Sequence, residues 1–219
     1  MSRNGASSSV LTDTTVRRAG PAGPERGSQD GGDRPARRSR ALPHANAYRG
    51  AVSADADRVL RQQLDGLGFD YEIVPCDPDL ADTAAFCRAY GYRMEDSANT
   101  IVVAGKGDPP RHAACVVLAT TRLDVNRTVR TRLGVRKASF ASAEDTQRLT
   151  GMMIGGVTVF GLPLDLPLWV DARVMDRQRI VLGGGSRSCK VLAPPDILLA
   201  LPNVEVVEGL AIQGENGSA

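Results

Sequence analysis

The chain has 219 residues, a net charge of +2 and an apolar content of 42%, which suit one globular domain with a polar tail. No apolar run is long enough to span a bilayer and none follows the first charged residues, so neither a transmembrane helix nor a secretory signal is expected. Four cysteines without paired spacing and only two histidines argue against a zinc site, and no cofactor is expected. Thiols in a chain without an export signal favour a cytoplasmic location.

The basic charge is concentrated near the N-terminus. Residues 1–50 hold nine arginines and four acidic residues, whereas residues 51–219 hold 18 basic and 21 acidic residues. Residues 1–48 are rich in Arg, Gly, Pro and Ser and contain almost no large apolar residue. Such a composition cannot offset the entropy of ordering, so this tail is predicted to be disordered. Its run RPARRSR fits either contact with RNA phosphates or simple solvation.

One folded domain over residues 53–210, followed by a flexible C-terminus over 211–219, is expected from the apolar pattern. The apolar runs at 100–104 and 113–119 are joined by a GDPP turn and predict a hairpin at the centre of a sheet. In chain order, the pattern predicts a helix over 59–67, a strand over 69–74, a helix over 82–90, that hairpin, a basic helix over 125–133, a helix capped by Ser142, strands over 168–174, 179–182 and 189–192, a helix after Pro195 and a strand over 204–207. This order predicts a mixed sheet with helices packed around it.

Two glycine-rich loops are the strongest functional signal. TGMMIGGVTVFG at 150–161 and GGGSR at 183–187 place glycines beside hydroxyl or basic residues, between apolar runs. Because glycine has no Cβ, it adopts positive φ readily and lets another molecule approach the backbone closely. Two such loops can line one pocket with backbone N–H groups, and the alternative is a pair of ordinary tight turns.

Five motifs follow one another in a recognisable order. They are TIVVA at 100–104, LGVRKASFAS at 133–142, LTGMMIGGVTVFG at 149–161, LWVDA at 168–172 and GGGSR at 183–187. In order and spacing they resemble the YbaK/ProX-type aminoacyl-tRNA deacylases over residues 64–210. The resemblance implies an α/β fold, a single compact domain with a curled mixed sheet surrounded by helices. It also implies hydrolysis of the ester that links a wrong amino acid to the tRNA 3′-end, with aminoacyl-tRNA as partner and an aminoacyl-tRNA synthetase as a second one.

The resemblance assigns roles to individual residues. The catalytic positions are Asn99, Thr100 and Asp171, and the substrate-binding positions are Gly155, Gly156, Thr158, Gly161, Gly184 and Arg187. The substrate ester is already activated, so positioning a water and stabilising the oxyanion with backbone N–H groups of the loops can suffice. Taken on their own, Asp171 fits equally well as the cap of a turn after its strand, and Arg187 as a surface residue on a turn.

Three positions depart from the family pattern. Asn99 stands where a lysine is usual, Val159 where the GGxxPxG loop carries proline, and Gly183 where a serine commonly begins the later loop. An asparagine donates hydrogen bonds but lacks the positive charge of lysine. Asn99 is therefore expected to orient a substrate without supplying cationic stabilisation.

A basic strip is predicted between residues 122 and 137, where six basic residues accompany a single aspartate, Asp124. Contact with the tRNA backbone is expected of Arg127, Arg130, Arg136 and Lys137. The alternative is a solvated helix face, because residues at this spacing cannot all share one side of a helix.

Two main hypotheses for the function remain open from the sequence. The first is a trans-editing hydrolase that acts on mischarged aminoacyl-tRNA. The second is a weakly active or inactive relative that keeps the pocket to bind an aminoacyl-tRNA end or an amino-acid-like ligand. Asn99 separates them. An enzyme deprived of charge gains activity from Asn99→Lys, and an enzyme in which Asn99 is an adapted substrate contact loses activity on Asn99→Ala and gains nothing from lysine. If neither the wild type nor Asn99→Lys hydrolyses any mischarged tRNA while the fold stays intact, the binding role is the better account. A third class, an interaction module without a ligand, leaves the glycine loops without a role.

Overall fold

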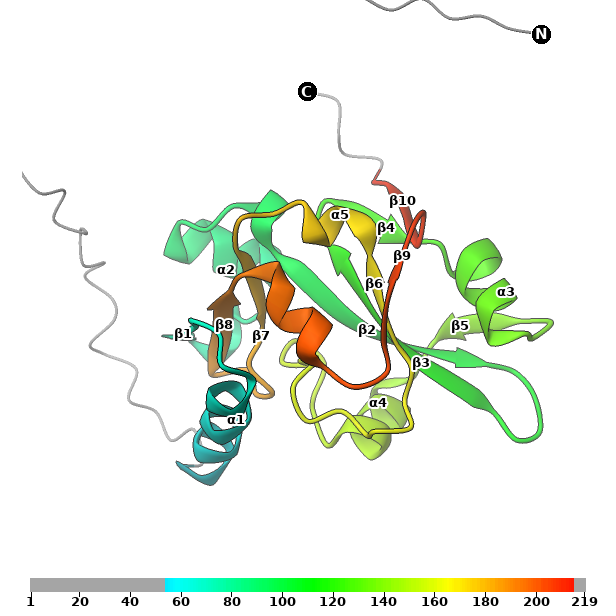
Figure 1. Cartoon of the computed structure of the whole chain (residues 1–219), viewed down its shortest axis with the longest axis horizontal. Helices are drawn as coiled ribbons and strands as arrows, with labels where there is room; N and C mark the ends of the chain where they lie inside the picture. The colour runs from blue at the N-terminus through cyan, green and yellow to red at the C-terminus, as the bar shows by residue number, and fades with distance from the viewer. Residues whose placement is uncertain (1–53, 215–219) are drawn as a thin grey trace, which may run out of the picture. The chain divides into compact units, whose positions relative to one another are not determined.

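A five-stranded mixed sheet forms the centre of the domain in the computed structural model, which describes residues 54–214 of the chain. Its strand order is β5-β2-β3-β6-β9 (Figure 1). The bounds are Ala98–Gly105 for β2, Arg111–Leu118 for β3, Ala138–Phe140 for β5, Leu168–Asp171 for β6 and Val204–Val207 for β9. β2 pairs antiparallel with β3 and β5, whereas β6 pairs parallel with β3 and β9. The expected mixed α/β fold is confirmed, while the tail expected over 1–48 lies outside the described residues.

Two smaller antiparallel sheets accompany the central one. The first has the order β1-β8-β7, with bounds Glu72–Pro75, Cys189–Ala193 and Ile180–Gly183. A parallel bridge between Ser97 and Val181 connects it to the start of β2. The second pairs β4, Thr121–Leu123, with β10, Ala211–Gln213. The bridge at Ser97 brings the loop after β7 close to the residues that begin β2, and this is where the candidate site lies.

The helices are short and begin and end at the expected residues in most cases. Gly68, with φ of 71°, follows the end of α1, and the Ser142 hydroxyl accepts a hydrogen bond from the Asp145 N–H at the start of α4. The basic helix expected over 125–133 occurs as a π-helical turn, η3, that continues into α3. The bounds are Ala54–Leu67 for α1, Thr83–Tyr90 for α2, Val125–Val129 for η3, Arg130–Leu133 for α3, Ala143–Thr150 for α4 and Ala172–Met175 for α5, with 3₁₀ turns at Pro78–Leu80 (η1), Met94–Asp96 (η2) and Pro195–Ala200 (η4).

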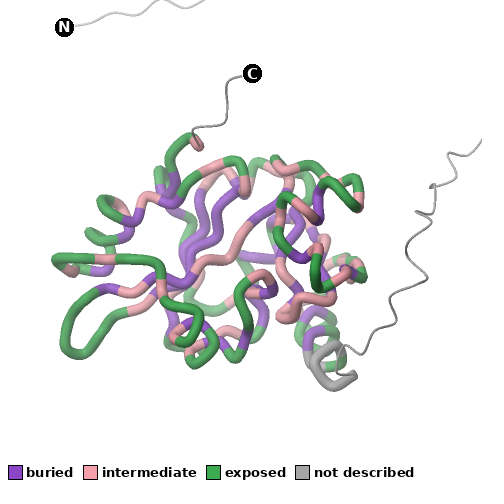
Figure 2. Tube along the Cα trace, turned by 180° about the vertical axis from the view of Figure 1, so that it is seen from behind, coloured by how far each residue is buried: buried purple, intermediate pink, exposed green. Residues whose placement is uncertain are grey.

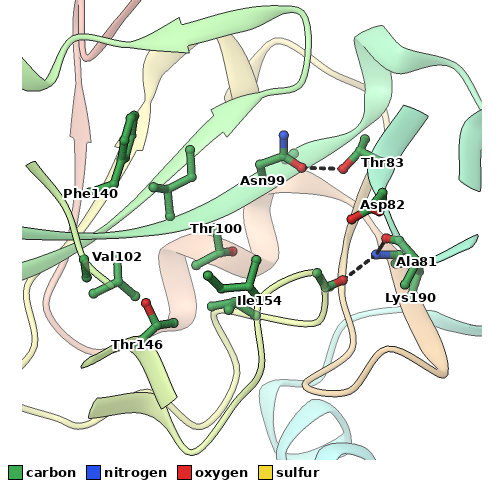
Figure 3. A pocket seen from close by; sticks show the side chains of 16 residues that line it. Ala81, Asp82, Thr83, Asn99, Thr100, Val102, Phe140, Thr146, Ile154 and Lys190 are labelled. Atoms are coloured by element: carbon green, nitrogen blue, oxygen red, sulfur yellow. Dashed lines mark hydrogen bonds between the residues drawn. The ribbon is translucent and has the colours of Figure 1, made fainter. Parts of the chain in front are cut away.

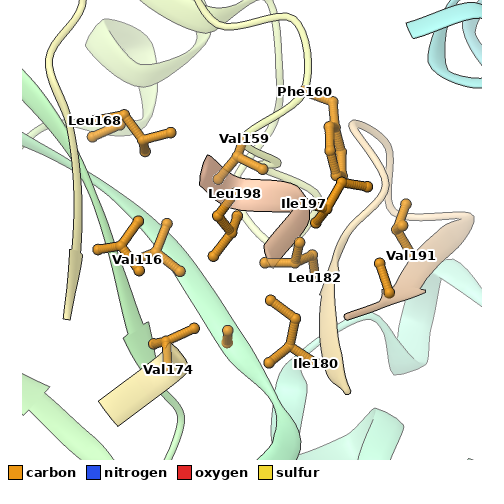
Figure 4. Packing of buried hydrophobic residues seen from close by; sticks show 14 of the residues in the cluster. Val116, Val159, Phe160, Leu168, Val174, Ile180, Leu182, Val191, Ile197 and Leu198 are labelled. Atoms are coloured by element: carbon orange, nitrogen blue, oxygen red, sulfur yellow. The ribbon is translucent and has the colours of Figure 1, made fainter. Parts of the chain in front are cut away.

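Both faces of β3, the second strand of the central hairpin, are buried from Ala113 to Leu118. Along β3, Ala114 and Val116 point into the larger core, which η4, β7 and β8 complete, and Figure 4 shows this packing. Cys115 and Val117 point into a second core on the other face. Burial raises the pKa of the Cys115 thiol to about 12. Figure 2 shows buried residues along the middle strands. Burial on both faces explains why residues 113–118 are continuously apolar and do not alternate between apolar and polar side chains.

The structure corrects two expected boundaries. The strand expected over 168–174 ends at Asp171, because the Asp171 carboxylate accepts a hydrogen bond from the Arg173 N–H and caps the short helix α5. The flexible C-terminus expected from residue 211 begins with a strand instead, since Ala211 is buried and β10 pairs with β4. Within residues 54–214, no helix is long and apolar enough to cross a membrane, and no group of three His, Cys, Asp or Glu side chains is placed to hold a metal ion.

Candidate functional site

A cavity of about 320 Å³ lies where β2, the start of α2, the loop after α4 and the small sheet meet (Figure 3). Its walls come from seven separate segments of the chain. The lining residues are Ala81, Asp82, Thr83, Ala98, Asn99, Thr100, Ile101, Val102, Phe140, Ala141, Thr146, Ile154, Gly155, Val157, Gly183 and Lys190. The cavity is thus the point at which the glycine loops meet the start of the central strand, as expected from the sequence.

Strand β2 brings Asn99 and Thr100 to the cavity. The Asn99 Oδ1 accepts a hydrogen bond of 2.7 Å from the Thr83 hydroxyl, which fixes the orientation of the amide (Figure 3). No partner for the Asn99 Nδ2 donors occurs among residues 54–214. The Thr100 hydroxyl is buried and has no hydrogen-bond partner in the same part of the chain. A buried polar group is normally satisfied, so the Thr100 hydroxyl is suited to meeting a ligand, and the half-buried Asn99 amide has donors to spare beside it.

The two glycine loops pack directly against each other. The Gly185 N–H donates a 2.8 Å hydrogen bond to the Gly156 carbonyl. A Cβ on Gly156 would lie 2.5 Å from the Ser186 carbonyl, and a Cβ on Gly183 would lie 2.2 Å from the Val157 carbonyl. Glycine is required at both positions because backbone meets backbone there.

The first loop contributes Ile154, Gly155 and Val157 to the cavity wall. Gly155, with φ of 91°, and Val157 both line it, and their N–H groups donate no hydrogen bond within the described residues. Backbone N–H groups held in this way form an uncharged site for an oxygen that carries negative charge.

A buried lysine completes the cavity. Lys190, on β8, is 6% exposed, and its Nζ donates to the Ala81 carbonyl at 2.6 Å and to the Gly155 carbonyl at 3.0 Å (Figure 3). Burial lowers the pKa of Lys190, because an ammonium loses solvation there. The same nitrogen lies 5.7 Å from the centre of the Phe86 ring. No carboxylate lies within 4 Å of it in residues 54–214.

Apolar side chains form the rim. Phe140, at the end of β5, is 57% exposed, and Ile154 in the first glycine loop is 55% exposed, although both line the cavity. Large apolar side chains left in water at the mouth of a pocket are a common feature of ligand sites. The cavity therefore combines an apolar mouth with polar groups at its inner end.

Several expected substrate-binding residues shape the loops and do not line the cavity. Arg187 donates to the carbonyls of Pro78 and Ile154, at 3.0 and 3.3 Å, and lies 3.7 Å from an Asp82 oxygen. It thereby joins the first glycine loop to the start of α2. Gly156, Gly184 and Thr158 lie behind the lining, and the buried Thr158 hydroxyl has no partner among the described residues. Gly161 lies elsewhere, at a second cavity of about 380 Å³ beside α1.

Asp171 lies outside the cavity. Its carboxylate is 1% exposed and binds the Arg173 guanidinium at 2.8 and 3.1 Å, and it accepts a 2.8 Å hydrogen bond from the Ala211 N–H. Arg173 also donates to the Ala211 carbonyl. These contacts hold the start of β10 against the end of β6, which favours the capping interpretation of Asp171 over a pocket role.

Asp171→Ala is therefore expected to destabilise the fold and to spare the site. Removing the buried carboxylate leaves the Ala211 N–H and the Arg173 guanidinium without their acceptor, at a cost of about 3 kcal/mol. Thermal unfolding measures this loss. An unfolding temperature equal to that of the wild type would contradict this structural role of Asp171.

The four expected tRNA-contact residues are all exposed. Arg127 lies on η3, Arg130 begins α3, and Arg136 and Lys137 precede β5. The neighbouring Arg132 is engaged, because it pairs with Glu205 and stacks 5.1 Å from the centre of the Trp169 ring. The last of the four, Lys137, directly precedes β5. Phe140, the last residue of this three-residue strand, lies at the rim of the cavity.

Comparison with known proteins identifies the family. Residues 77–201, more than half of the chain, match the family described as aminoacyl-tRNA editing domain. The chain belongs to this family. The matched segment includes Asn99, both glycine loops and Lys190, so the whole cavity lies within the editing domain.

Solved structures share the fold. A candidate trans-editing enzyme for prolyl tRNA synthetase is 23% identical with a TM-score of 0.62, and the match covers 75% of this chain and 100% of that one. A protein from a study of computational epitope grafting on scaffolds is 22% identical with a TM-score of 0.62, over 74% and 99% of the two chains. A hypothetical protein is 21% identical with a TM-score of 0.59, over 67% and 96%.

Sequence reasoning missed some of the lining residues. Thr83 belongs to no motif, and Phe140 lies in the motif LGVRKASFAS, but the resemblance assigns it no role. Lys190 stands in the strand CKVLA, where a polar residue normally marks the solvent side. One signal for Lys190 was present, since the chain has only three lysines and this one interrupts an apolar run. A lone lysine between buried apolar residues is unusual enough to attract a functional hypothesis.

Proposed function

We propose that this editing-domain protein is a trans-editing hydrolase, which cleaves the ester between a wrong amino acid and the 3′-end of tRNA. One observation carries the proposal: Gly155 and Val157, whose N–H groups donate no hydrogen bond within residues 54–214, line the same cavity as Asn99 and Lys190. An oxyanion forms when water attacks an ester, and donors placed in advance stabilise it. A cavity of about 320 Å³ suits a small ligand such as an aminoacyl end.

The division of the cavity suits the two ends of such a substrate. Val102, Phe140 and Ile154 offer apolar contact at the mouth and walls. The donors at the inner end, on β2 and the first glycine loop, suit the acyl group. The N-terminus of α2, at Thr83, adds partial positive charge on that side. Water attacks the acyl carbon, the bond to the ribose oxygen breaks, and the amino acid and the tRNA leave separately.

A binding role is the second candidate, and one observation favours it. Asn99 carries no charge, and its amide is held by Thr83 in a way that suits recognition of a substrate. Under this alternative the protein retains an aminoacyl-tRNA end without hydrolysing it.

A screen of mischarged tRNAs tests the proposal. Full-length protein is mixed with tRNAs that each carry a labelled wrong amino acid, and release of the label is measured against spontaneous hydrolysis. Correctly charged tRNAs serve as the control. Faster release from at least one mischarged tRNA supports the hydrolase, while tight binding without release supports the second candidate.

The path of the tRNA can be tested through the exposed basic residues. Replacing Arg127, Arg130 and Arg136 with glutamine is expected to weaken tRNA binding and to flatten its dependence on salt, by roughly one unit of slope for each phosphate that the variant no longer neutralises. Arg93, which is 73% exposed and pairs with Glu95, provides the control Arg93→Gln. A slope that is equal in the triple variant and the wild type would assign these arginines to ordinary solvated surface.

A further inference from the structure

One N–H donor of the Lys190 ammonium has no acceptor within residues 54–214. An ammonium has three N–H donors, and the carbonyls of Ala81 and Gly155 take two of them. No third acceptor for Lys190 occurs in the part of the chain that the structure describes. Lys190 lines the cavity, and its Nζ is held between two other lining residues, Ala81 and Gly155.

The burial of this charge is not explained by stability. A buried ammonium without a carboxylate partner is unfavourable for folding, since its hydration is lost and only two neutral carbonyls and the face of the Phe86 ring replace it. The charged groups around Lys190 are Asp82, which is largely exposed, and Arg187, which repels it, with the thiols of Cys76 and Cys189 also near. Residues that are costly to bury are commonly retained at functional sites.

A small recess extends the cavity beside Lys190. It measures about 20 Å³, room for roughly one water molecule. Its lining shares Thr83, Asn99, Gly183 and Lys190 with the larger cavity. The lysine and the asparagine therefore face a common space, although they come from strands about 90 residues apart in the chain.

We propose that Lys190 is a catalytic residue of this site, which donates a hydrogen bond to the acyl oxygen of the aminoacyl ester and stabilises the negative charge that develops there. This inference rests on the proposed hydrolase function. During the reaction Lys190 keeps its protons. Water adds to the acyl carbon, the bond to the ribose oxygen breaks, and the proton released by the water ends on that ribose oxygen.

Because lysine is rare in this chain, the contact of Lys190 with a ligand can be followed by NMR. Its three lysines are Lys106, Lys137 and Lys190, so a protein grown with ¹³C-lysine gives few side-chain NMR signals. Lys190→Met and Lys106→Met assign them. The Lys190 signal is expected to titrate below the ordinary value of 10.5, because burial lowers its pKa.

The probe is a panel of 3′-aminoacylamino-adenosines, one for each standard amino acid, in which an amide replaces the ester. Binding of a matching analogue is expected to shift the Lys190 signal and to leave the Lys106 signal in place. If Lys190 has only the structural role of bridging the carbonyls of Ala81 and Gly155, its signal would stay unchanged when the analogue binds. That result would overturn the inference.

Hydrolysis provides the second readout. Lys190→Met is expected to lower kcat about 100-fold with a smaller change in KM, as for loss of one oxyanion donor. Lys106→Met should match the wild type. If Lys190→Met does not fold, Lys190→Gln keeps an N–H donor without the charge, and the wild-type NMR result stands by itself.

The outcomes separate this inference from the proposed function. Hydrolysis by the wild type, with Lys190→Met equally active, would overturn the role of Lys190 alone. If an analogue shifts the Lys190 signal but the protein hydrolyses no mischarged tRNA, Lys190 contacts the ligand and the proposed hydrolase function is overturned. A wild type that neither hydrolyses mischarged tRNA nor binds any analogue would overturn both.

Discussion

Gly183→Ala is expected to destabilise the protein and to abolish most of the proposed hydrolysis. A Cβ at this position would lie 2.2 Å from the Val157 carbonyl oxygen and 2.8 Å from that of Gly156, both of them backbone atoms. Backbone cannot rotate away as a side chain does, so the first glycine loop must move. We expect a loss of about 3 kcal/mol or more, which lowers the midpoint of thermal unfolding by roughly 10 °C.

The same displacement acts on the site, because Val157 and Gly155 would carry their N–H groups away from the cavity. Gly66→Ala is the matched control. Gly66 is in α1, where a Cβ meets no atom within 4 Å, so this change should stabilise the helix by about 0.5–1 kcal/mol. A Gly183→Ala variant with unchanged melting and activity would contradict the close packing of the two loops.

This packing accounts for one departure from the family pattern. A serine at position 183 would bring the same Cβ into the Val157 carbonyl, so the present loop arrangement requires glycine there. The sequence alone reveals that the residue differs, and the reason appears only when both loops are placed. Loop contacts of this kind depend on long-range geometry that a local pattern does not encode.

The central fold could be predicted from the sequence because its signals are local. The apolar runs of β2 and β3 and the turn between them predict the hairpin, and Ser142 predicts the start of α4. The meeting of the two glycine loops at one cavity was likewise expected and is observed. These features follow from hydrophobic burial and from turn and cap chemistry, which act over a few residues.

The parts of the site that escaped prediction depend on tertiary placement. A polar residue between the apolar residues of a strand normally faces solvent, so the sequence suggests an exposed Lys190. In the structure, β8 is the middle strand of its sheet, and the first glycine loop covers Lys190. Asp171 fits a cap and a pocket role equally in sequence, and Arg173 and Ala211 show which contacts it makes. The contact partners of Lys190 and Asp171 come from distant segments of the chain. The periodicity of apolar residues does not specify which distant segments meet.

Asn99 offers the sharpest test of how this cavity works. Asn99→Ala is expected to lower the hydrolysis of mischarged tRNA about 100-fold, because it removes a donor at the inner end of the cavity and leaves the Thr83 hydroxyl without its acceptor. Asn99→Asp separates the two effects, since it keeps an acceptor for Thr83 and removes the amide donors. Single-turnover rates with one mischarged tRNA measure each change.

Asn99→Lys is expected not to exceed the wild-type rate. Lys190 already places an ammonium in this cavity, so a second one adds repulsion between like charges and displaces the contact with Thr83. Combining Asn99→Lys with Lys190→Met removes that repulsion, and this double variant should recover part of the activity that Lys190→Met alone removes. A rise of about 10-fold or more in Asn99→Lys alone would instead mean that the wild-type cavity lacks a required charge, and Lys190 would then not be the cation of the reaction.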